Sequence, residues 1–220
     1  MMSSRTCTAA VVGALALAVG CTSPDPLDQP CPPSQHNGRA LFDGTQESLD
    51  RWRMAGPGSF ELQEDCSLRT VGGMGLLWFP EELESYRLIL DWKVAGDDNS
   101  GVFVGFPEPG DDPWVAVNDG YEVQIDATDA PDRTTGAIYL HQGADQAAVA
   151  RALEPPGAWN TYEITVEGRT VTVHLNGTLV NSFDSDRPDG DLSGHVGLQN
   201  HGEDDDVYFR DIRVAGLDGR

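Results

Sequence analysis

From Leu41 to its C-terminus the chain is a succession of short β-prone runs separated by Gly, Pro, Asp and Asn. The run YRLILDWKV (86–94) has an apolar side chain at every second position, which is the period of a strand. Only the segment 146–153 could form a turn or two of helix. Many short strands between turn signals predict an all-β protein, a sandwich or jelly roll.

Further strands are predicted at 101–106, 120–127, 136–142, 159–168, 170–177, 195–202 and 206–217. Tight hairpin signals occur at Gly168-Arg169 and at Asn176-Gly177, and Asn-Gly is the strongest short hairpin pattern. The hydrophobic share of 39% is modest, as expected for strands that have one face in water.

The strand at 120–127 carries a row of hydrogen-bonding side chains on one face, formed by Glu122, Gln124 and Asp126. Neighbouring strands add polar groups of the same kind, namely Tyr139, His141, His195, Gln199 and His201. Amides, carboxylates and aromatic rings are the groups that a sugar site uses. The alternative is the ordinary solvated face of an antiparallel sheet.

The first twenty residues are predicted to be a signal peptide of the lipoprotein type. Their apolar run, AAVVGALALAVG, is too short to span a membrane and ends directly before Cys21. This resembles a bacterial lipobox, in which Cys21 receives the lipid, although Leu17 is one place too early for the usual pattern. We therefore expect an exported protein anchored to the outer face of a bacterial membrane, or a secreted one if the lipobox is not used.

Residues 21–38 are rich in Pro, Ser and Asp and are predicted to be a tether, so the domain would span 39–220. Cys7 leaves with the signal and Cys21 is assigned to the lipid. Cys31 and Cys66 remain, and in an exported protein we expect them to form a disulfide, with two free thiols as the alternative. The formal net charge of −22 argues against nucleic acid as a partner, and we expect a monomer.

Several motifs, in order over about residues 40–217, resemble the 3-keto-disaccharide hydrolase family. They are Leu41-Phe-Asp-Gly44, Gly75-Leu-Leu-Trp78, Asn99-Ser-Gly-Val-Phe103, Gly120-Tyr-Glu-Val-Gln-Ile125, Thr135-Gly-Ala-Ile-Tyr139, Trp159-Asn160, Leu175-Asn-Gly177, Gly197-Leu-Gln-Asn-His-Gly202 and Phe209-Arg-Asp-Ile212. The resemblance implies a concanavalin-like jelly roll and a substrate already oxidised to a ketone at sugar carbon 3. The chain departs from the family at Gly105, where Arg is frequent, so a cationic contact would be missing.

An ordinary glycosidase needs two carboxyl groups that flank the scissile bond, roughly 5–5.5 Å or about 6.5–9.5 Å apart. On an extended strand Glu122 and Asp126 would be about 13 Å apart, at roughly 3.3 Å per residue. A 3-keto sugar needs less, because the ketone acidifies the hydrogen on carbon 2, and one base and one acid then suffice for elimination and hydration.

We therefore expect Glu122 and His201 to be the catalytic pair, with Lys93 or a metal stabilising the enolate. Substrate hydroxyls would be held by Asn99, Gln124, Tyr139, His141 and Gln199. No cofactor is expected. A divalent ion held by Glu122, His141 and His201 is an open alternative without a short ligand motif to support it.

Each of these residues also has a plain structural interpretation. His201 could cap a turn, Lys93 could pair across the sheet, and His174 and His195 are expected at the surface. The alternative function is a lectin-like module that binds carbohydrate without catalysis, because the jelly roll serves both classes.

Overall fold

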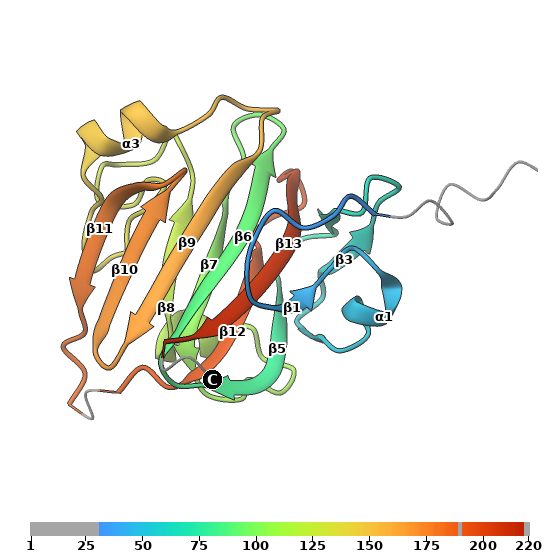
Figure 1. Ribbon diagram of the computed structural model, residues 1–220, viewed down its shortest axis with the longest axis horizontal. Helices are drawn as coiled ribbons and strands as arrows, with labels where there is room; N and C mark the ends of the chain where they lie inside the picture. The colour runs from blue at the N-terminus through green and yellow to red at the C-terminus, as the bar shows by residue number, and fades with distance from the viewer. Residues whose placement is uncertain (1–30, 189–190, 218–220) are drawn as a thin grey trace, which may run out of the picture. The chain divides into compact units, whose positions relative to one another are not determined.

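Two antiparallel sheets face each other in the computed structural model, which describes residues 31–188 and 191–217 (Figure 1). The all-β sandwich expected from the sequence is therefore confirmed. The predicted signal peptide (1–20), the lipid site at Cys21 and the first part of the tether lie outside the described residues.

The larger sheet has eight strands in the order β11-β10-β9-β6-β13-β4-β3, and β1 also pairs with β13. Its strands are β1 (Arg39–Phe42), β3 (Ser59–Leu62), β4 (Leu68–Val71), β6 (Tyr86–Val94), β9 (Asn160–Glu167), β10 (Thr170–Leu175), β11 (Thr178–Asp184) and β13 (Val207–Gly216). The hairpins at 168–169 and 176–177 join β9, β10 and β11 as predicted.

The smaller sheet has five strands in the order β2-β5-β12-β7-β8. They are β2 (Arg53–Ala55), β5 (Gly75–Leu83), β12 (Gly194–Asn200), β7 (Ser100–Phe106) and β8 (Tyr121–Ile125). Three short helices complete the described structure, α1 (Gln46–Leu49), α2 (Trp114–Asp119) and α3 (Gln146–Ala152). Within the residues described, none of these helices is long and apolar enough to cross a membrane.

The core lies between the sheets and follows from the alternation in the sequence. In β6 the side chains of Leu88, Leu90 and Trp92 are buried and belong to the main core cluster. From the opposite sheet, Val123 and Ile125 of β8 join the same cluster. Because successive side chains of a strand point to opposite faces, the residues between them are turned outward. Burial on this scale is the main source of stability in such a sandwich.

The strand predicted at 136–142 is wrong. Ile138 forms only isolated bridges, to Val123 and to Gln142, and the chain from Ile138 to Gln142 makes a tight turn. The backbone N–H groups of His141 and Gln142 both donate to Ile138 O at 2.9 Å. Leu140 has a φ of 61°, in the left-handed region that an extended strand does not visit. Tyr139 and His141 therefore do not share a face in the way that alternation implied.

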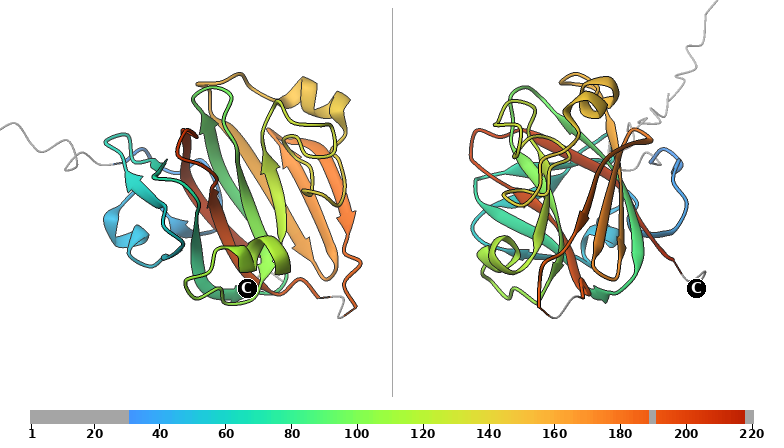
Figure 2. Two further views of the ribbon diagram at one scale, coloured as in Figure 1. Left: turned by 180° about the vertical axis from the view of Figure 1, so that it is seen from behind. Right: turned by 90° about the vertical axis from the view of Figure 1, so that its left-hand side faces the viewer.

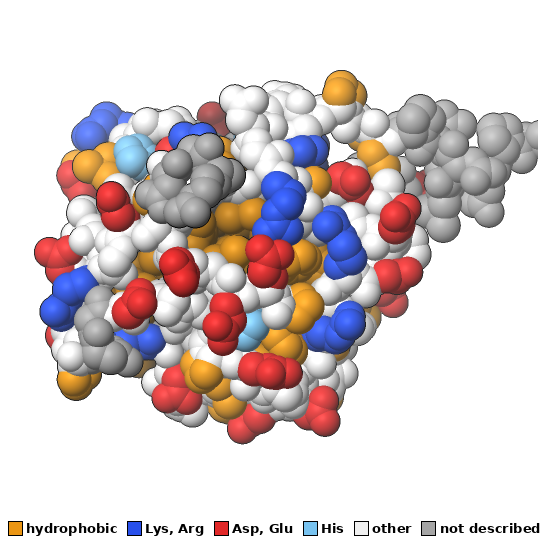
Figure 3. Space-filling view, turned by 60° about the horizontal axis from the view of Figure 1, so that its bottom comes forward, with side chains coloured by type: hydrophobic (Ala, Val, Ile, Leu, Met, Phe, Trp, Pro, Cys, Tyr) orange, Lys and Arg blue, Asp and Glu red, His pale blue; other side chains and the backbone are white. Residues whose placement is uncertain are grey.

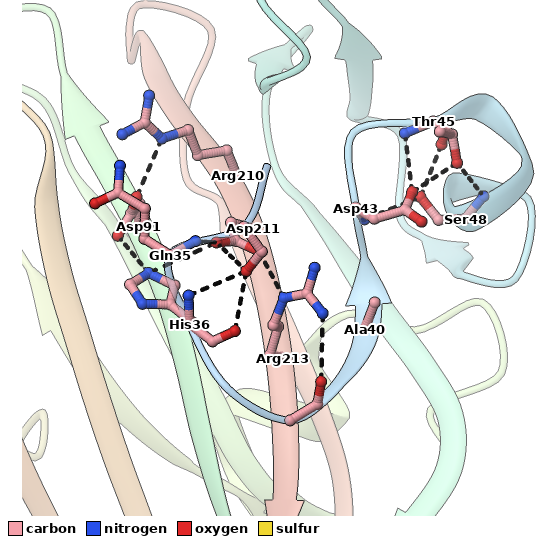
Figure 4. A network of polar contacts seen from close by, with 12 residues as sticks. Gln35, His36, Ala40, Asp43, Thr45, Ser48, Asp91, Arg210, Asp211 and Arg213 are labelled. Carbon is pink, nitrogen blue, oxygen red and sulfur yellow. Dashed lines mark hydrogen bonds and ion pairs between the residues drawn. The ribbon is translucent and has the colours of Figure 1, made fainter. Parts of the chain in front are cut away.

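Residues 31–38, placed in the tether by their composition, lie along the outer face of the eight-stranded sheet (Figure 4). Cys31 forms the expected disulfide with Cys66, in the turn between β3 and β4. The His36 ring contacts Asp91 Oδ1 at 2.9 Å, and Arg210 donates to the other oxygen of that carboxylate at 3.1 Å. The first part of the described chain is thus tied to the sheet by a covalent link and an ion-pair network.

Charged side chains are mixed on the face drawn in Figure 3, where carboxylates are scattered among Lys and Arg. The net charge of −22 is therefore not gathered into one acidic patch on this face. Such a surface favours solubility.

Replacing both Cys31 and Cys66 with Ser is expected to lower the free energy of unfolding by about 2–4 kcal/mol, because the link constrains the unfolded chain. Urea unfolding of the oxidised wild type and the double variant measures the loss. Adding a reductant should produce the same loss in the wild type and none in the variant. Equal stability of the two oxidised proteins would contradict the prediction.

Candidate functional site

A cleft of about 310 Å³ opens on the outer face of the five-stranded sheet. Figure 2 shows the short helix α2 lying over this sheet. The cleft is lined by side chains from two strands, one helix and the adjoining loops, namely Met74, Asn99, Trp114, Val117, Glu122, Gln124, Tyr139, Gln199 and His201.

The floor of the cleft is built by β8 and β12, with β7 between them. Glu122 and Gln124 face outward because the alternate residues of β8 are in the core. On β7, Gly101 lies opposite Gln124. A Cβ at this glycine would collide with Glu122 Oε1 and lie 2.6 Å from Glu122 Cγ. The glycine therefore makes room for the carboxyl group inside the sheet surface.

Three acceptor oxygens in this floor are buried without a hydrogen-bond partner among the described residues. They are the Oε1 atoms of Glu122, Gln124 and Gln199, whose residues are only 7%, 1% and 6% exposed. Buried polar atoms are normally paired, and leaving one unpaired costs about 1–3 kcal/mol. Grouped in one cleft, these oxygens fit a ligand that brings several donors, such as the hydroxyl groups of a sugar.

Burial raises the pKa of the Glu122 carboxyl to about 8, because the charged form loses its hydration, and the neighbouring Gln199 amide only partly opposes this. At neutral pH the group is therefore mainly a neutral carboxylic acid. A carboxylic acid in a cleft can donate a proton to a departing oxygen.

His201 is held at the rim of the cleft by Asp205. Its Nδ1 lies 2.8 Å from Asp205 Oδ2, and the other oxygen of this carboxylate accepts the Asn99 N–H at 2.7 Å. With Nδ1–H donated to the carboxylate, the neutral imidazole has its lone pair on Nε2. The ring is thus oriented to act as a base.

Six of the eight predicted catalytic and substrate-binding residues line this one cleft: Asn99, Glu122, Gln124, Tyr139, Gln199 and His201. Asp126, the third member of the polar row, follows the end of β8. Its Oδ1 accepts the backbone N–H groups of Thr128 and Asp129, and its Oδ2 accepts from the side-chain amide of Asn99 at 3.3 Å. Two of the three members of the row therefore line the cleft, and the third contacts a residue that does.

The prediction that Lys93 belongs to the site is wrong. Lys93 alternates with the core residues of β6 and so lies on the outer face of the eight-stranded sheet, on the other side of the sandwich. Its ammonium group is 4.7 Å from the centre of the Trp159 ring and 4.4 Å from that of Tyr208. Lys93 therefore makes cation–π contacts on that face and cannot reach an enolate in the cleft.

His141 is also misplaced by the sequence. The turn at 138–142 leaves it exposed, packed against the rings of Tyr121 at 4.8 Å and Phe183 at 5.8 Å. The metal site considered for Glu122, His141 and His201 is consequently not assembled. Across the part of the chain that the structure describes, no group of three potential metal ligands from His, Cys, Asp or Glu occurs.

His195, expected at the surface, is buried. Its Nδ1 lies 3.0 Å from Phe79 O, and its ring packs against Trp78 at 5.0 Å and Phe106 at 5.9 Å. These rings lie beneath helix α2, which covers this part of the outer face. Because α2 covers it, this part of the outer face is not solvated and forms a second, smaller core.

At Gly105, where the family often has Arg, the backbone has a φ of 66°, which favours glycine. A Cβ there would lie 3.0 Å from Leu192 O. Arg187 reaches this strand from another segment and donates to Gly105 O at 2.9 Å, but it is not among the residues that line the cleft.

Four contributors to the site were missed from the sequence: Met74, Trp114, Val117 and Asp205. The first three lie in loops or in α2, a helix of only six residues without a periodic signal. Asp205 belongs to an acidic run, and its pairing with His201 depends on the turn between β12 and β13. A run of four acidic residues after a histidine was the only available signal.

Comparisons with known proteins identify the family to which the chain belongs. Residues 37–215 match the model of the family described as 3-keto-alpha-glucoside-1,2-lyase-like domain. A 3-keto-disaccharide hydrolase from Bacteroides thetaiotaomicron is 26% identical over 230 residues, covering 81% of this chain and 78% of that protein.

Solved structures are similar as well. A candidate glycosyl hydrolase from Parabacteroides distasonis has a TM-score of 0.66 at 25% identity, covering 83% of this chain and all of that one. A carbohydrate-binding module, CBM66, from Bacillus subtilis has a TM-score of 0.54 at 12% identity, covering 76% and 96%. At that identity the second likeness concerns the fold alone.

Gly101→Ala is expected to lower the free energy of unfolding by about 1–3 kcal/mol, because the new methyl group must displace the buried Glu122 carboxyl. Urea unfolding measures the change. Gly96→Ala is the matched control, since a Cβ there would come no nearer than 3.9 Å to Asp98. Equal stabilities of the two variants would show that the carboxyl group is not confined as described.

The raised pKa of Glu122 predicts a pH-dependent stability. Between about pH 4.5 and 8 the unfolded chain releases this proton while the folded chain keeps it, so stability falls as pH rises. Relative to wild type, Glu122→Gln should therefore gain stability across this window, by at most about 1.4 kcal/mol per pH unit. Urea titrations at pH 5 and pH 8 test this. The exposed Glu167→Gln should show no such gain, and a gain equal in both variants would refute the assignment.

Proposed function

The chain belongs to the 3-keto-alpha-glucoside-1,2-lyase-like domain family, and we propose that it cleaves glycosides that already carry a ketone at sugar carbon 3. The observation that carries this proposal is the pairing in one cleft of a buried, neutral Glu122 with an oriented His201. A module that only binds sugar would need amides and aromatic rings, but not this ionisable pair.

The number of carboxyl groups in the cleft argues against an ordinary glycosidase mechanism. Of the described residues that line the cleft, Glu122 alone has a carboxyl group, whereas glycosidases of the usual kind use two. One acid and one base are sufficient when a ketone at carbon 3 has made the hydrogen on carbon 2 acidic.

The reaction then has two stages. His201 Nε2 removes the proton from carbon 2, and the electron pair moves onto the ketone oxygen as an enolate. When the ketone re-forms, the bond from carbon 1 to the leaving oxygen breaks, and Glu122 donates its proton to that oxygen. Water next adds to carbon 1 and its proton returns to Glu122. The half-exposed His201 ring exchanges the proton it took with solvent and then protonates carbon 2. The net result is the consumption of one water.

The enolate oxygen would be stabilised by a neutral donor. No Lys or Arg is among the described residues that line the cleft, so this role passes to the Tyr139 hydroxyl. Preorganised neutral donors in a site shielded from water can stabilise a developing oxyanion strongly.

The N-terminal sequence adds a proposal about location. With a lipoprotein-type signal ending before Cys21, the protein would work outside the cytoplasm, held to the outer face of a membrane by lipid on that cysteine. If the signal is cleaved without lipidation, the protein would be secreted.

The test is to incubate the purified protein with a 3-keto aryl glucoside and to follow release of the aryl group. The parent glucoside without the ketone should not be cleaved, because its carbon 2 hydrogen is not acidic. In D₂O the early product should carry deuterium at carbon 2, which direct hydrolysis would not introduce. Glu122→Gln and His201→Ala should each slow release by about 10²-fold or more. The controls Glu167→Gln and His174→Ala, on the other sheet, should not.

The pH profile of this reaction assigns the roles. If Glu122 is the acid, the rate should fall as pH rises through about 8, because the carboxyl group loses the proton that it must donate. A rate that rises through the same pH would make Glu122 the base. Binding without release of the aryl group would favour the lectin-like module instead.

A further inference from the structure

The lining of the cleft is of two chemical kinds, and we propose that its apolar part binds the leaving group of the glycoside as a flat aromatic aglycone, not as a second sugar. Trp114 would be the main determinant of this specificity. This inference rests on the proposed function and adds to it the class of leaving group.

The apolar part of the lining comes from α2 and from the residue that precedes β5. Met74 immediately precedes β5, and α2, which contributes Trp114 and Val117, packs over a cluster with residues from β2, β5 and β7. The polar groups come from β8, β12 and the adjoining loops. A ligand that fills the cleft therefore meets both hydrogen-bonding groups and an apolar wall.

Trp114 is 54% exposed, although tryptophan is highly buried on average. A single exposed apolar residue is unremarkable by itself. Here, however, the indole lines one concave surface together with Met74 and Val117, and the floor of that surface carries the unpaired buried oxygens of Glu122 and Gln199. An exposed ring beside a polar floor is the arrangement expected for stacking a flat ligand.

The segment that presents Trp114 is tied to the rest of the sheet. The Asp112 carboxylate accepts the backbone N–H of Trp114 at 3.0 Å, and the backbone N–H of Gly56 donates to Asp111 O at 3.1 Å. Ala116 is fully buried in the cluster beneath α2, so the helix has a fixed seat. A platform fixed before binding costs less ordering when the ligand arrives.

The same wall is poorly suited to a second sugar. A pyranose can stack its C–H face on an indole, but the hydroxyl groups around its edge would then meet Met74 and Val117, and each hydroxyl left there without a partner is unfavourable. The side chains of Met74 and Val117 have no N–H or O–H group, and Trp114 offers a single N–H. An aromatic ring loses no hydrogen bonds in this surrounding and gains contact with the indole.

The test compares benzyl and methyl 3-keto-glucosides, whose leaving groups are both simple alcohols, with 3-keto-trehalose. In the wild type kcat/KM for the benzyl substrate should exceed that for the methyl substrate by about tenfold or more, and should exceed that for 3-keto-trehalose. Trp114→Ala should reduce the benzyl-to-methyl ratio to near one. Trp114→Phe should preserve most of it, because a flat ring remains.

Val117→Ser, a second change in the same wall, should lower the ratio in the same direction if Trp114→Ala proves unstable. Leu179→Ala, an exposed apolar residue on β11, is the matched control and should leave the ratio unchanged. If all three substrates are cleaved at equal efficiency, or if the ratio survives in Trp114→Ala, the aglycone assignment is overturned and the keto-glycoside reaction stands. If none is cleaved, the proposed function fails and the inference fails with it.

Discussion

The burial of one carboxyl group on the outer face of a sheet is the constraint on which the whole site depends. Glu122 can lie there only because Gly101, on the adjacent strand, has no side chain. The resulting desolvation keeps the acid protonated near neutral pH, and the neighbouring amide oxygens are held in the same dry floor. The position of Glu122, its protonation state and the burial of the amide oxygens beside it thus all depend on the absence of a side chain at Gly101.

The outer faces of the two sheets are covered differently. The outer face of the eight-stranded sheet is covered in part by residues 31–38 and by the pairing of Asp91 with His36 and Arg210. On the outer face of the five-stranded sheet α2 covers one part, and the cleft opens beside it. This division explains why polar residues with the same alternation have different fates. On one sheet they bind the chain itself, and on the other they line an open cleft.

Alternation in the sequence was sufficient to predict the sandwich, both hairpins and the strands β6 to β10, β12 and β13, whereas the strands before β6 were not predicted. It also grouped Glu122 and Gln124, because strand period alone decides which residues share a face. It could not decide which sheet a strand joins, so Lys93 was assigned to a site that lies on the other side of the molecule. The turn through Leu140 was invisible as well, because β-prone residues can adopt a left-handed conformation when tertiary contacts require it. Trp114 and Asp205 depend on loop geometry that no local pattern encodes.

The disulfide between Cys31 and Cys66 has a mechanical consequence. A pull on the backbone ahead of Cys31 would pass through the covalent link directly to residue 66. The intervening segment, which contains β1, α1, β2 and β3, would be shielded from that tension. Drag on the upstream peptide would therefore load the loop before β4, and the noncovalent pairing of β1 with β13 would not have to resist it.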